Sequence, residues 1–365
     1  MTDSFQENHI WQTDSTVFAG QTRPENEYLA KAYDFIKSWQ SGQTSFGLQT
    51  SGSTGSPKVI ALTRHQLRSS ASMTGRALKL GAGTRALVCL NVEYIAGVMM
   101  LVRGMELGWK LTIIPPVSNP LKQITPDISF DFVAMVPMQL SACLDDPETR
   151  TGVGRLGKVL LGGAPIGVQL LKQIKSLCIP VYQSYGMTET VSHVALRKLN
   201  GTDRVSAYQF LPGVTAGLDE RGCLHVSGEM TNGELVQTND LVEMNSDHEF
   251  TWLGRYDNVI NSGGVKIILD RLDDEIALVF DALYLKQAYF SWYQEDERLG
   301  QKLILFVEGK VDEETAMILI NEIRKRVSAY QTPKHVYFVN RFEKTPTNKI
   351  DKRRTAAVLF NNFNG

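Results

Sequence analysis

The fold is decided by four short apolar runs: ALVCL at residues 86–90, KLTII at 110–114, FVAMV at 132–136 and KVLL at 158–161. Helical patterns separate them, among others at 65–80 and 96–107. Buried strands that alternate with helices are typical of a layered α/β domain with a largely parallel sheet. Prolines and glycines follow the runs, at the strand ends where open α/β sheets bind their ligands.

The pattern changes near residue 254. Short strands at 259–260 and 265–269 flank NSGG at 261–264, and helices at 271–280 and 312–327 alternate with strands at 288–293, 303–308 and 336–339. This order predicts a small α+β unit of about 100 residues. We therefore predict a large α/β domain at 1–254, a hinge near 255–257 and a mobile C-terminal domain at 258–365.

Composition argues against several classes of protein. The net charge of the 365 residues is −1 and no basic stripe with interleaved aromatics is present, so we expect no nucleic-acid partner. The longest apolar stretch, Tyr94–Val102, is half the length that a membrane span needs. The first ten residues lack a signal-peptide pattern, so we expect a cytoplasmic protein. The four cysteines are widely spaced, which predicts neither disulfides nor a zinc site.

The sequence TSGSTGSPK at residues 50–58 predicts a phosphate-binding loop. Small hydroxyl residues and glycines let backbone N–H groups approach an anion closely, and Lys58 adds a positive charge. It is not a Walker A loop, because Pro57 precedes the lysine and Val59 replaces the Ser or Thr that would follow. A flexible surface loop is the alternative interpretation.

This loop resembles the phosphate loop of the adenylate-forming superfamily, which includes acyl- and aryl-CoA synthetases, luciferases and the adenylation domains of peptide synthetases. Further similar motifs follow in the family's order: GGAP at 162–165, YGMTET at 185–190, TND at 238–240, GRYD at 254–257, INSGGVKI at 260–267 and KTPTNKID at 344–351. The resemblance runs from about residue 46 to the end of the chain. It implies a large domain, a small hinged domain, and an enzyme that joins an acid to a thiol through an acyl-adenylate.

The resemblance also implies roles for individual residues. Catalysis would involve Lys349, Thr188 and Glu189, with Glu189 as the Mg²⁺ ligand. Tyr185 would stack on the adenine, Asp240 would hold the ribose hydroxyls, and the full ATP-binding set would be Thr50, Ser51, Gly52, Ser53, Thr54, Gly55, Lys58, Gly162, Gly163, Ala164, Tyr185, Gly186, Asp240 and Arg255. The hinge and the coenzyme A site would use Asp257, Gly263, Gly264 and Lys266. ATP, Mg²⁺ and coenzyme A as co-substrate are thus expected.

Within the superfamily, the compact chain and Val191-Ser192-His193 resemble the o-succinylbenzoate–CoA ligases of menaquinone synthesis. Their substrate is an aromatic keto diacid, of which one carboxylate reacts and the other must be held. Polar groups such as Ser192, His193 or Arg197 are therefore expected near the acyl pocket. Tyr94 is expected there too, because EYIAG at 93–97 replaces the family's usual histidine-containing segment. A buried histidine with satisfied hydrogen bonds is the alternative interpretation of His193.

Two features depart from the family. Asn348 replaces the glycine that usually precedes the catalytic lysine, and asparagine is the next-best residue at positive φ. Only about 50 residues precede the phosphate loop, where family members have well over a hundred. We therefore expect an acyl pocket that is more open, or one completed by a second subunit, for example in a homodimer. The alternative functions are another aryl- or acyl-CoA ligase, an adenylation enzyme that loads a carrier protein, and a degenerate nucleotide-binding protein.

Overall fold

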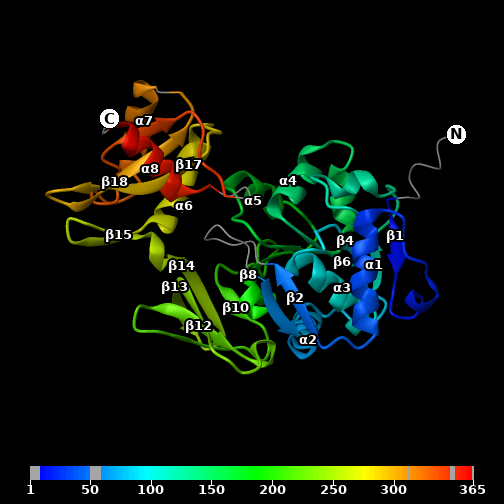
Figure 1. Cartoon of the computed structure of the whole chain (residues 1–365). Helices are drawn as coiled ribbons and strands as arrows, with labels where there is room; N and C mark the ends of the chain where they lie inside the picture. Colours follow the sequence, from blue (N-terminus) through cyan, green and yellow to red (C-terminus); the bar gives the residue numbers. More distant parts are fainter. Residues whose placement is uncertain (1–8, 50–58, 311, 346–349, 364–365) are drawn as a thin grey trace.

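The computed structural model describes residues 9–49, 59–310, 312–345 and 350–363. Two sheets organise these residues (Figure 1). The larger is a 12-stranded sheet in the order β1-β5-β4-β6-β7-β8-β9-β10-β14-β13-β12-β11. The smaller is a five-stranded sheet in the order β16-β15-β18-β17, with β19 beside β18, and β2 and β3 form a separate two-stranded ribbon.

The large sheet, its helices and the β2–β3 ribbon occupy the described chain up to residue 255. The strands are β1 (Trp11–Thr13), β2 (Ser45–Gln49), β3 (Val59–Thr63), β4 (Arg85–Val88), β5 (Lys110–Ile113), β6 (Phe132–Met135), β7 (Lys158–Leu161), β8 (Val181–Gly186), β9 (His193–Lys198), β10 (Tyr208–Phe210), β11 (Thr215–Leu218), β12 (Cys223–Ser227), β13 (Val236–Ser246) and β14 (Glu249–Arg255). The helices are α1 (Glu27–Gln40), α2 (Arg64–Leu78), α3 (Ile95–Leu107), α4 (Pro137–Asp145) and α5 (Val168–Lys175).

In the large sheet of the described residues, parallel pairing is confined to β5, β4, β6, β7 and β8. Strand β1 joins β5 in antiparallel fashion, and the pairings of this sheet from β8 to β11 are antiparallel. The predicted α/β class is confirmed, and the sheet is parallel where the four apolar runs predicted it. Between Met187 and Arg255 only three-residue helical turns interrupt the strands. Without a crossover helix, most consecutive strands there pair antiparallel; the exception is β10, which pairs with β14 and not with β11.

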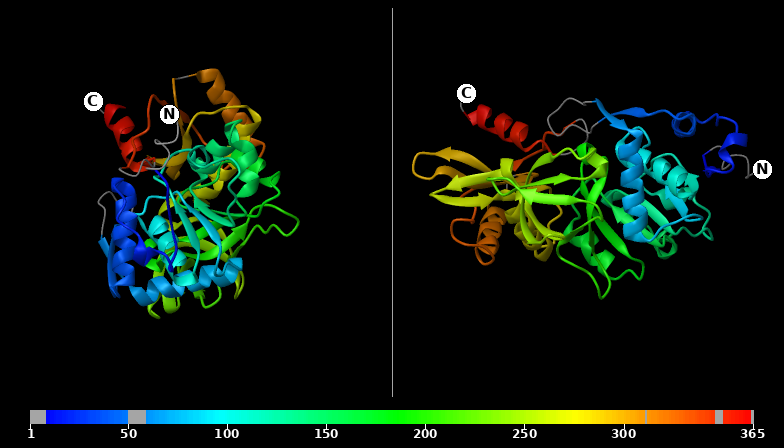
Figure 2. Two further views of the ribbon diagram at one scale, coloured as in Figure 1. Left: turned by 90° about the vertical axis from the view of Figure 1, so that its right-hand side faces the viewer. Right: turned by 90° about the horizontal axis from the view of Figure 1, so that it is seen from below.

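The parallel strands bury both of their faces. Leu87, Val133 and Val159 pack with α4 and α5, whereas the adjacent Ala86, Phe132 and Leu160 pack with α1, α2 and α3. Helices therefore cover the sheet on both sides, as the views in Figure 1 and Figure 2 show. This arrangement explains why the strands read as continuous apolar runs rather than as alternating ones.

The small sheet follows the second part of the sequence pattern. Its elements are β15 (Val259–Ser262), β16 (Val265–Ile268), α6 (Leu269–Ala282), β17 (Tyr289–Asp296), β18 (Gly300–Glu308), α7 (Glu313–Arg324), β19 (Val336–Val339) and α8 (Lys352–Phe363). Leu303 and Leu305 of β18 pack with α6 and α7, and Ile304 and Phe306 form a second cluster with Ala356 of α8. Helix α8 was not predicted, because its first turn is a run of three basic residues.

Few polar contacts join the two sheets. Asp281 of α6 accepts hydrogen bonds from Lys172, at 2.5 Å, and from Gln169, both on α5. Asp270 accepts the backbone N–H of Arg255 at 2.8 Å. The strands of the large sheet end at Arg255 and those of the small sheet begin at Val259, so the predicted hinge lies between them. The domain division and the hinge movement remain predictions.

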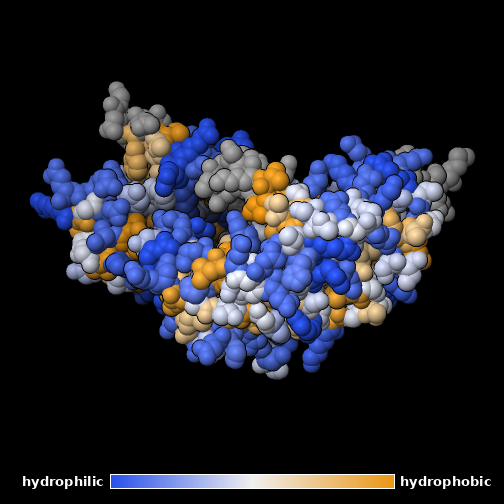
Figure 3. All heavy atoms as spheres, turned by 60° about the horizontal axis from the view of Figure 1, so that its bottom comes forward, coloured by the Kyte–Doolittle hydropathy of each residue, from blue (hydrophilic) through white to orange (hydrophobic). Residues whose placement is uncertain are grey.

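The surface is mixed in character. Figure 3 shows one face, on which apolar residues form small groups among polar ones. None of the described helices is both long enough and apolar enough to cross a lipid bilayer.

Asn200 fixes the loop between α5 and β8 from a buried position. Its side chain is 2% exposed and donates to the carbonyls of Leu177 and Ile179, at 2.9 and 2.8 Å. Its carbonyl accepts the N–H of Val181 at 3.0 Å. One side chain thus satisfies three backbone groups where β8 enters the sheet.

We expect Asn200→Leu to lower the free energy of unfolding by about 2–4 kcal/mol, because two carbonyls and one N–H lose the side-chain partner that the structure gives them. Urea denaturation followed by circular dichroism measures the change. The control is Asn321→Leu on the exposed side of α7, where we expect a change within about 0.5 kcal/mol. Equal effects of the two substitutions would contradict this account of Asn200.

Candidate active site

A buried carboxylate forms the centre of the predicted nucleotide site. Asp240 on β13 is 7% exposed. Its Oδ2 accepts the hydroxyl of Tyr185 at 2.6 Å, and its Oδ1 accepts Nε1 of Trp252 at 3.3 Å. The backbone N–H of Asp240 donates to Thr238 Oγ1 at 3.0 Å. Arg255 lies opposite Asp240 in the β13–β14 register, so the structure brings three predicted residues together.

Tyr185 reaches this carboxylate from the end of β8. Burial, and then the neighbouring Asp240, raise the pKa of its hydroxyl, so Tyr185 stays protonated and acts as a donor. Its ring packs against Phe250 and Tyr208, with centroids 5.1 and 5.8 Å away. Stacking of this ring on an adenine remains a prediction.

Two glycine turns lie beside Tyr185 at the carboxyl edge of the parallel strands. Gly162 follows β7, and a Cβ built on it would lie 2.6 Å from the Ser184 hydroxyl. Gly163 has φ +80°, a conformation that glycine adopts without strain. Gly186 ends β8, where a Cβ would lie 2.2 Å from the carbonyl oxygen of Ser192. Ala164 is exposed next to the first turn.

A strained turn follows the second glycine. Thr188–Thr190 forms one helical turn, with Glu189 exposed on it. Val191 then has φ +67° and ψ −56°, and the Ser192 N–H donates to the Thr190 carbonyl at 2.8 Å. This is a γ-turn of the strained kind, at a β-branched residue that rarely takes positive φ. The turn separates the exposed Glu189 from the buried side chains that follow.

Beyond this turn lies a buried polar cluster around Arg103 of α3. The Arg103 side chain is among the largest that are fully buried, at 2% exposure. Its Nη2 donates to Ser192 Oγ at 3.0 Å, and its Nε donates to Thr74 Oγ1 of α2 at 3.2 Å. His193 lies 3.1 Å from Thr74 Oγ1 and 3.3 Å from Ser192 Oγ. Among the described residues no carboxylate pairs with Arg103.

The other predicted acyl-pocket residues lie outside this cluster. Tyr94 is 41% exposed at the start of α3. Arg197 points to Gln183 and lies over the Tyr208 ring, with its guanidinium carbon 5.0 Å from the ring centroid. Neither makes a hydrogen bond to the Arg103 cluster within the described part of the chain.

The predicted hinge and coenzyme A residues lie around β15. Asp257 accepts Nη2 of Arg255 at 3.0 Å and Nδ2 of Asn239 at 3.3 Å. Gly263 and Gly264, at φ +60° and +81°, form the two-residue loop between β15 and β16. Lys266 is exposed on β16. Figure 1 shows the β15–β16 hairpin at the far left, well away from the end of β8.

Some predicted residues lie outside the described part of the chain. These are Thr50, Ser51, Gly52, Ser53, Thr54, Gly55 and Lys58 of the predicted phosphate loop, and the predicted catalytic Lys349. Their roles remain predictions.

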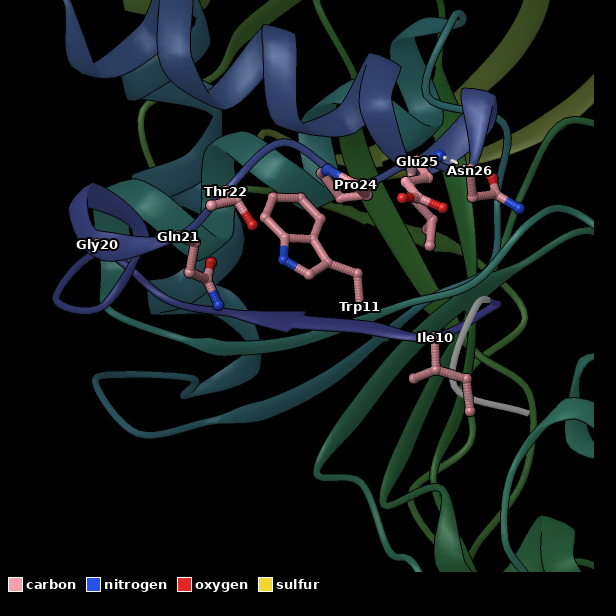
Figure 4. A pocket seen from close by; sticks show the side chains of 9 residues that line it. Ile10, Trp11, Gly20, Gln21, Thr22, Pro24, Glu25 and Asn26 are labelled. Carbon is pink, nitrogen blue, oxygen red and sulfur yellow. Dashed lines mark hydrogen bonds between the residues drawn. The ribbon is translucent and has the colours of Figure 1, made fainter. Parts of the chain in front are cut away.

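A shallow, open pocket lies elsewhere, between β1 and the start of α1 (Figure 4). It measures about 420 Å³ and is lined by residues between Ile10 and Leu29, including Trp11, Gln21 and Asn26. None of the predicted site residues lines it. The described residues of the predicted nucleotide and acyl sites therefore lie outside this pocket.

Comparison with known proteins decides the family. The family model described as AMP-binding enzyme matches residues 8–241. The chain belongs to the AMP-binding enzyme family. An acyl-CoA synthetase (AMP-forming)/AMP-acid ligase II-like protein of Dyadobacter fermentans is 58% identical, with a TM-score of 0.68 over 96% of this chain and 99% of that one. The AMP-binding assignment confirms the predicted superfamily and enzyme class, an AMP-forming acid–thiol ligase.

Curated relatives of this AMP-binding enzyme include two 2-succinylbenzoate–CoA ligases. That of Lactococcus lactis is 25% identical over 320 residues, and that of Salmonella typhimurium is 28% identical over 331 residues. The matches cover 83% and 87% of this chain and 68% and 69% of the relatives. The fold is shared with o-succinylbenzoate coenzyme A synthetase of Bacillus subtilis, solved with ATP and magnesium, at 20% identity and a TM-score of 0.67 over 85% of this chain and 69% of that one.

Sequence reasoning missed three members of the site. Trp252 binds Asp240, and Arg103 and Thr74 belong to the buried cluster. A signal for Arg103 was present, because it is a charged residue inside the apolar helical run that surrounds it. No pattern marked Thr74, which is one of several polar residues on an amphipathic helix where Gln66, Ser69 and Ser70 are buried as well.

The strain at Val191 predicts an unusual order of stabilities. Val191 is fully buried. We expect Val191→Gly to be more stable than Val191→Ala by about 1 kcal/mol, because only glycine takes the positive φ without steric cost. At the equally buried Val194 of β9 we expect the alanine variant to be more stable by about 0.5–1 kcal/mol. Thermal unfolding of the four variants gives both comparisons, and the same order at both positions would argue against strain at Val191.

Proposed function

We propose that this enzyme activates o-succinylbenzoate with ATP and transfers the acyl group to coenzyme A. In the first half-reaction a carboxylate oxygen of the acid attacks the α-phosphorus of ATP and pyrophosphate leaves. In the second, the thiol of coenzyme A loses its proton and attacks the acyl carbon, and AMP leaves. The names of the curated relatives support the substrate. The observation that carries it is the buried Arg103 beside Ser192 and His193.

Arg103 has the chemistry that a second carboxylate needs. Its guanidinium has five N–H donors, of which Nε and Nη2 bond to hydroxyl oxygens and Nη1 lies 4.0 Å from the sulfur of Met100. Burial lowers the pKa of Arg103 to about 9, which leaves it cationic at neutral pH. A buried cation without a counter-ion carries a desolvation cost of several kcal/mol. A dicarboxylate offsets that cost, since one carboxylate pairs with Arg103 while the other reacts.

His193 leaves Arg103 as the positive charge of this cluster. Burial, and then the charge of Arg103, lower the pKa of His193 well below its usual value. The ring is therefore neutral and adds no second positive charge. A fatty acid would leave Arg103 unpaired in an apolar surrounding, so its pocket would have no use for this cluster.

The nucleotide residues supply a matching set of groups. The two oxygens of Asp240 each accept one hydrogen bond from the protein, and a carboxylate has about four acceptor sites, so room remains for two ribose hydroxyls. The glycine turns at Gly162 and Gly186 allow close approach of a ligand to the backbone. Glu189, an exposed hard oxygen ligand, would hold Mg²⁺ together with substrate phosphates and water. Magnesium would neutralise the charge that builds up on those phosphates.

The remaining roles follow the sequence motifs. The loop at residues 50–58 would hold the β- and γ-phosphates, and Thr188 would lie beside them. Lys349 would bridge the substrate carboxylate and the α-phosphate. A second half-reaction would require Lys349 to leave and the Gly263–Lys266 loop to approach, by rotation about the hinge at Asp257. The distance of the β15–β16 hairpin from β8 in Figure 1 is consistent with a step that needs movement.

The function is tested by a pyrophosphate-release assay with ATP and Mg²⁺ across a panel of acids, with and without coenzyme A. We expect release that depends on o-succinylbenzoate, and consumption of coenzyme A to a thioester. A carrier protein added in place of coenzyme A should accept no acyl group. Release with another acid alone would overturn the substrate, and transfer only to a carrier protein would overturn the thiol acceptor.

Arg103→Met should separate activity from stability. We expect kcat/KM for o-succinylbenzoate to fall about 100-fold, because the second carboxylate loses its charged partner. The free energy of unfolding should stay equal or rise, since an uncompensated buried cation is replaced by an apolar chain. The control is Arg76→Met at an exposed position of α2, which should change neither quantity. An Arg103→Met enzyme with full activity would contradict the proposed substrate contact.

A further inference from the structure

Thr74 connects the groups that form the Arg103 cluster. It lies in α2 and is fully buried. Its hydroxyl oxygen is 3.1 Å from the carbonyl of Ser70, 3.1 Å from Nε2 of His193 and 3.2 Å from Nε of Arg103. A single oxygen thus links side chains that come from α3 and β9.

One arrangement of the hydrogens makes all of these contacts hydrogen bonds. In it the Thr74 hydroxyl donates its one hydrogen to the Ser70 carbonyl and accepts from both His193 and Arg103. His193 therefore carries its proton on Nε2, and its Nδ1 accepts the hydroxyl hydrogen of Ser192. Ser192 in turn accepts Nη2 of Arg103. The four side chains Thr74, His193, Ser192 and Arg103 form a closed ring of hydrogen bonds.

This ring fixes the plane of the guanidinium. Arg103 donates to the ring through two different nitrogens, Nε and Nη2. Because a guanidinium is planar, two such bonds determine the direction of its remaining donors. Without the bond to Thr74, the bond of Nη2 to Ser192 and the weak contact of Nη1 with the Met100 sulfur would remain, and the group could turn more freely.

The backbone around Thr74 leaves little room for adjustment. A Cβ built on the next residue, Gly75, would lie 2.9 Å from Leu107 of α3 and 3.1 Å from the Leu80 carbonyl. Helices α2 and α3 therefore pack closely at this level. A capping box between Thr63 and Gln66 defines the start of α2. The position of the Thr74 oxygen is thus set by the scaffold.

We propose that Thr74 is a positioning residue that sets the preference for a dicarboxylate, because its oxygen orients both Arg103 and His193 behind Ser192. This inference rests on the proposed function, in which Arg103 holds the second carboxylate of the acid. Thr74 itself touches no substrate in this account; it acts through Arg103.

The test compares Thr74→Val with Thr74→Ser in the full-length enzyme. Valine keeps the shape and removes the hydroxyl, and serine restores it. The control is Thr13→Val on β1, since the Thr13 hydroxyl is also buried but has no partner among the described residues. Each enzyme is assayed with o-succinylbenzoate and with 3-benzoylpropanoate, which lacks the ring carboxylate.

We expect Thr74→Val to lower kcat/KM for o-succinylbenzoate by about 10- to 100-fold, mainly through KM, because the donors that receive the acid are misaligned. The value for 3-benzoylpropanoate should stay within about threefold, since misalignment at Arg103 does not affect an acid without the second carboxylate. Thr74→Ser and Thr13→Val should keep the wild-type preference. In ¹⁵N NMR spectra, the slowly exchanging Nε–H signal of Arg103 should disappear only in Thr74→Val.

Two results would overturn the inference while the proposed function stands: an unchanged preference in Thr74→Val, or an equal loss with both acids, which indicates a purely structural role. A wild-type enzyme that shows no preference for the dicarboxylate would instead overturn the proposed function and the inference with it. Should Thr74→Val not fold, Thr74→Cys gives the same comparison. A cysteine side chain is similar in size to that of threonine, and its sulfur accepts hydrogen bonds only weakly, so the bonds from Arg103 and His193 are weakened.

Discussion

The burial of β5, β4, β6, β7 and β8 on both faces is the constraint on which the other features depend. Parallel strands need crossover helices, so the segments that follow them emerge at one edge of the sheet. The glycine turns after β7 and at the end of β8 become neighbours for this reason. At β8 the pairing becomes antiparallel, and the antiparallel part brings Asp240 within hydrogen-bonding distance of Tyr185. The candidate site lies at this change of topology.

Buried polar groups in this fold are satisfied in different ways, and the difference separates structural from functional roles. Asn200 has backbone partners for both of its polar atoms, so its burial is explained by the fold alone. Asp240 accepts two hydrogen bonds but keeps acceptor sites free. Arg103 donates hydrogen bonds through Nε and Nη2, while its charge has no counter-ion among the described residues. A buried charge of this kind is costly unless a ligand completes it.

Local periodicity and short motifs in the sequence predicted some of the strands and some of the site residues. The strand at 158–161 and the last strand, 336–339, were placed with the bounds that the structure has, because their apolar runs end at clear breaks. The antiparallel strands between Tyr208 and Ser246 were not resolved individually. Strands β10 and β11 have only three and four residues, and the 11-residue β13 is only half-buried. Contacts across the sequence could not be predicted either. Thr74 is 29 residues from Arg103 and 119 residues from His193 in the sequence, and no local pattern predicts contacts over such separations.

The two costly features of the structure, which are far apart in the chain, meet at Ser192. The strained Val191 lies directly before Ser192, and Ser192 accepts a hydrogen bond from the uncompensated Arg103. Strain and unpaired charge persist only where the surrounding structure enforces them, and they concentrate at sites that act on ligands. Here the surroundings are rigid, because Gly186 packs against the Ser192 carbonyl and Gly75 packs against α3. A relaxed turn at Val191 would free Ser192 from Arg103 and stabilise the chain, yet it would also uncouple the Arg103 cluster, the proposed binding site of the acid, from Glu189, two residues before Val191. The cost at Val191 is therefore best understood as the means by which one short segment holds both sides of the site in register.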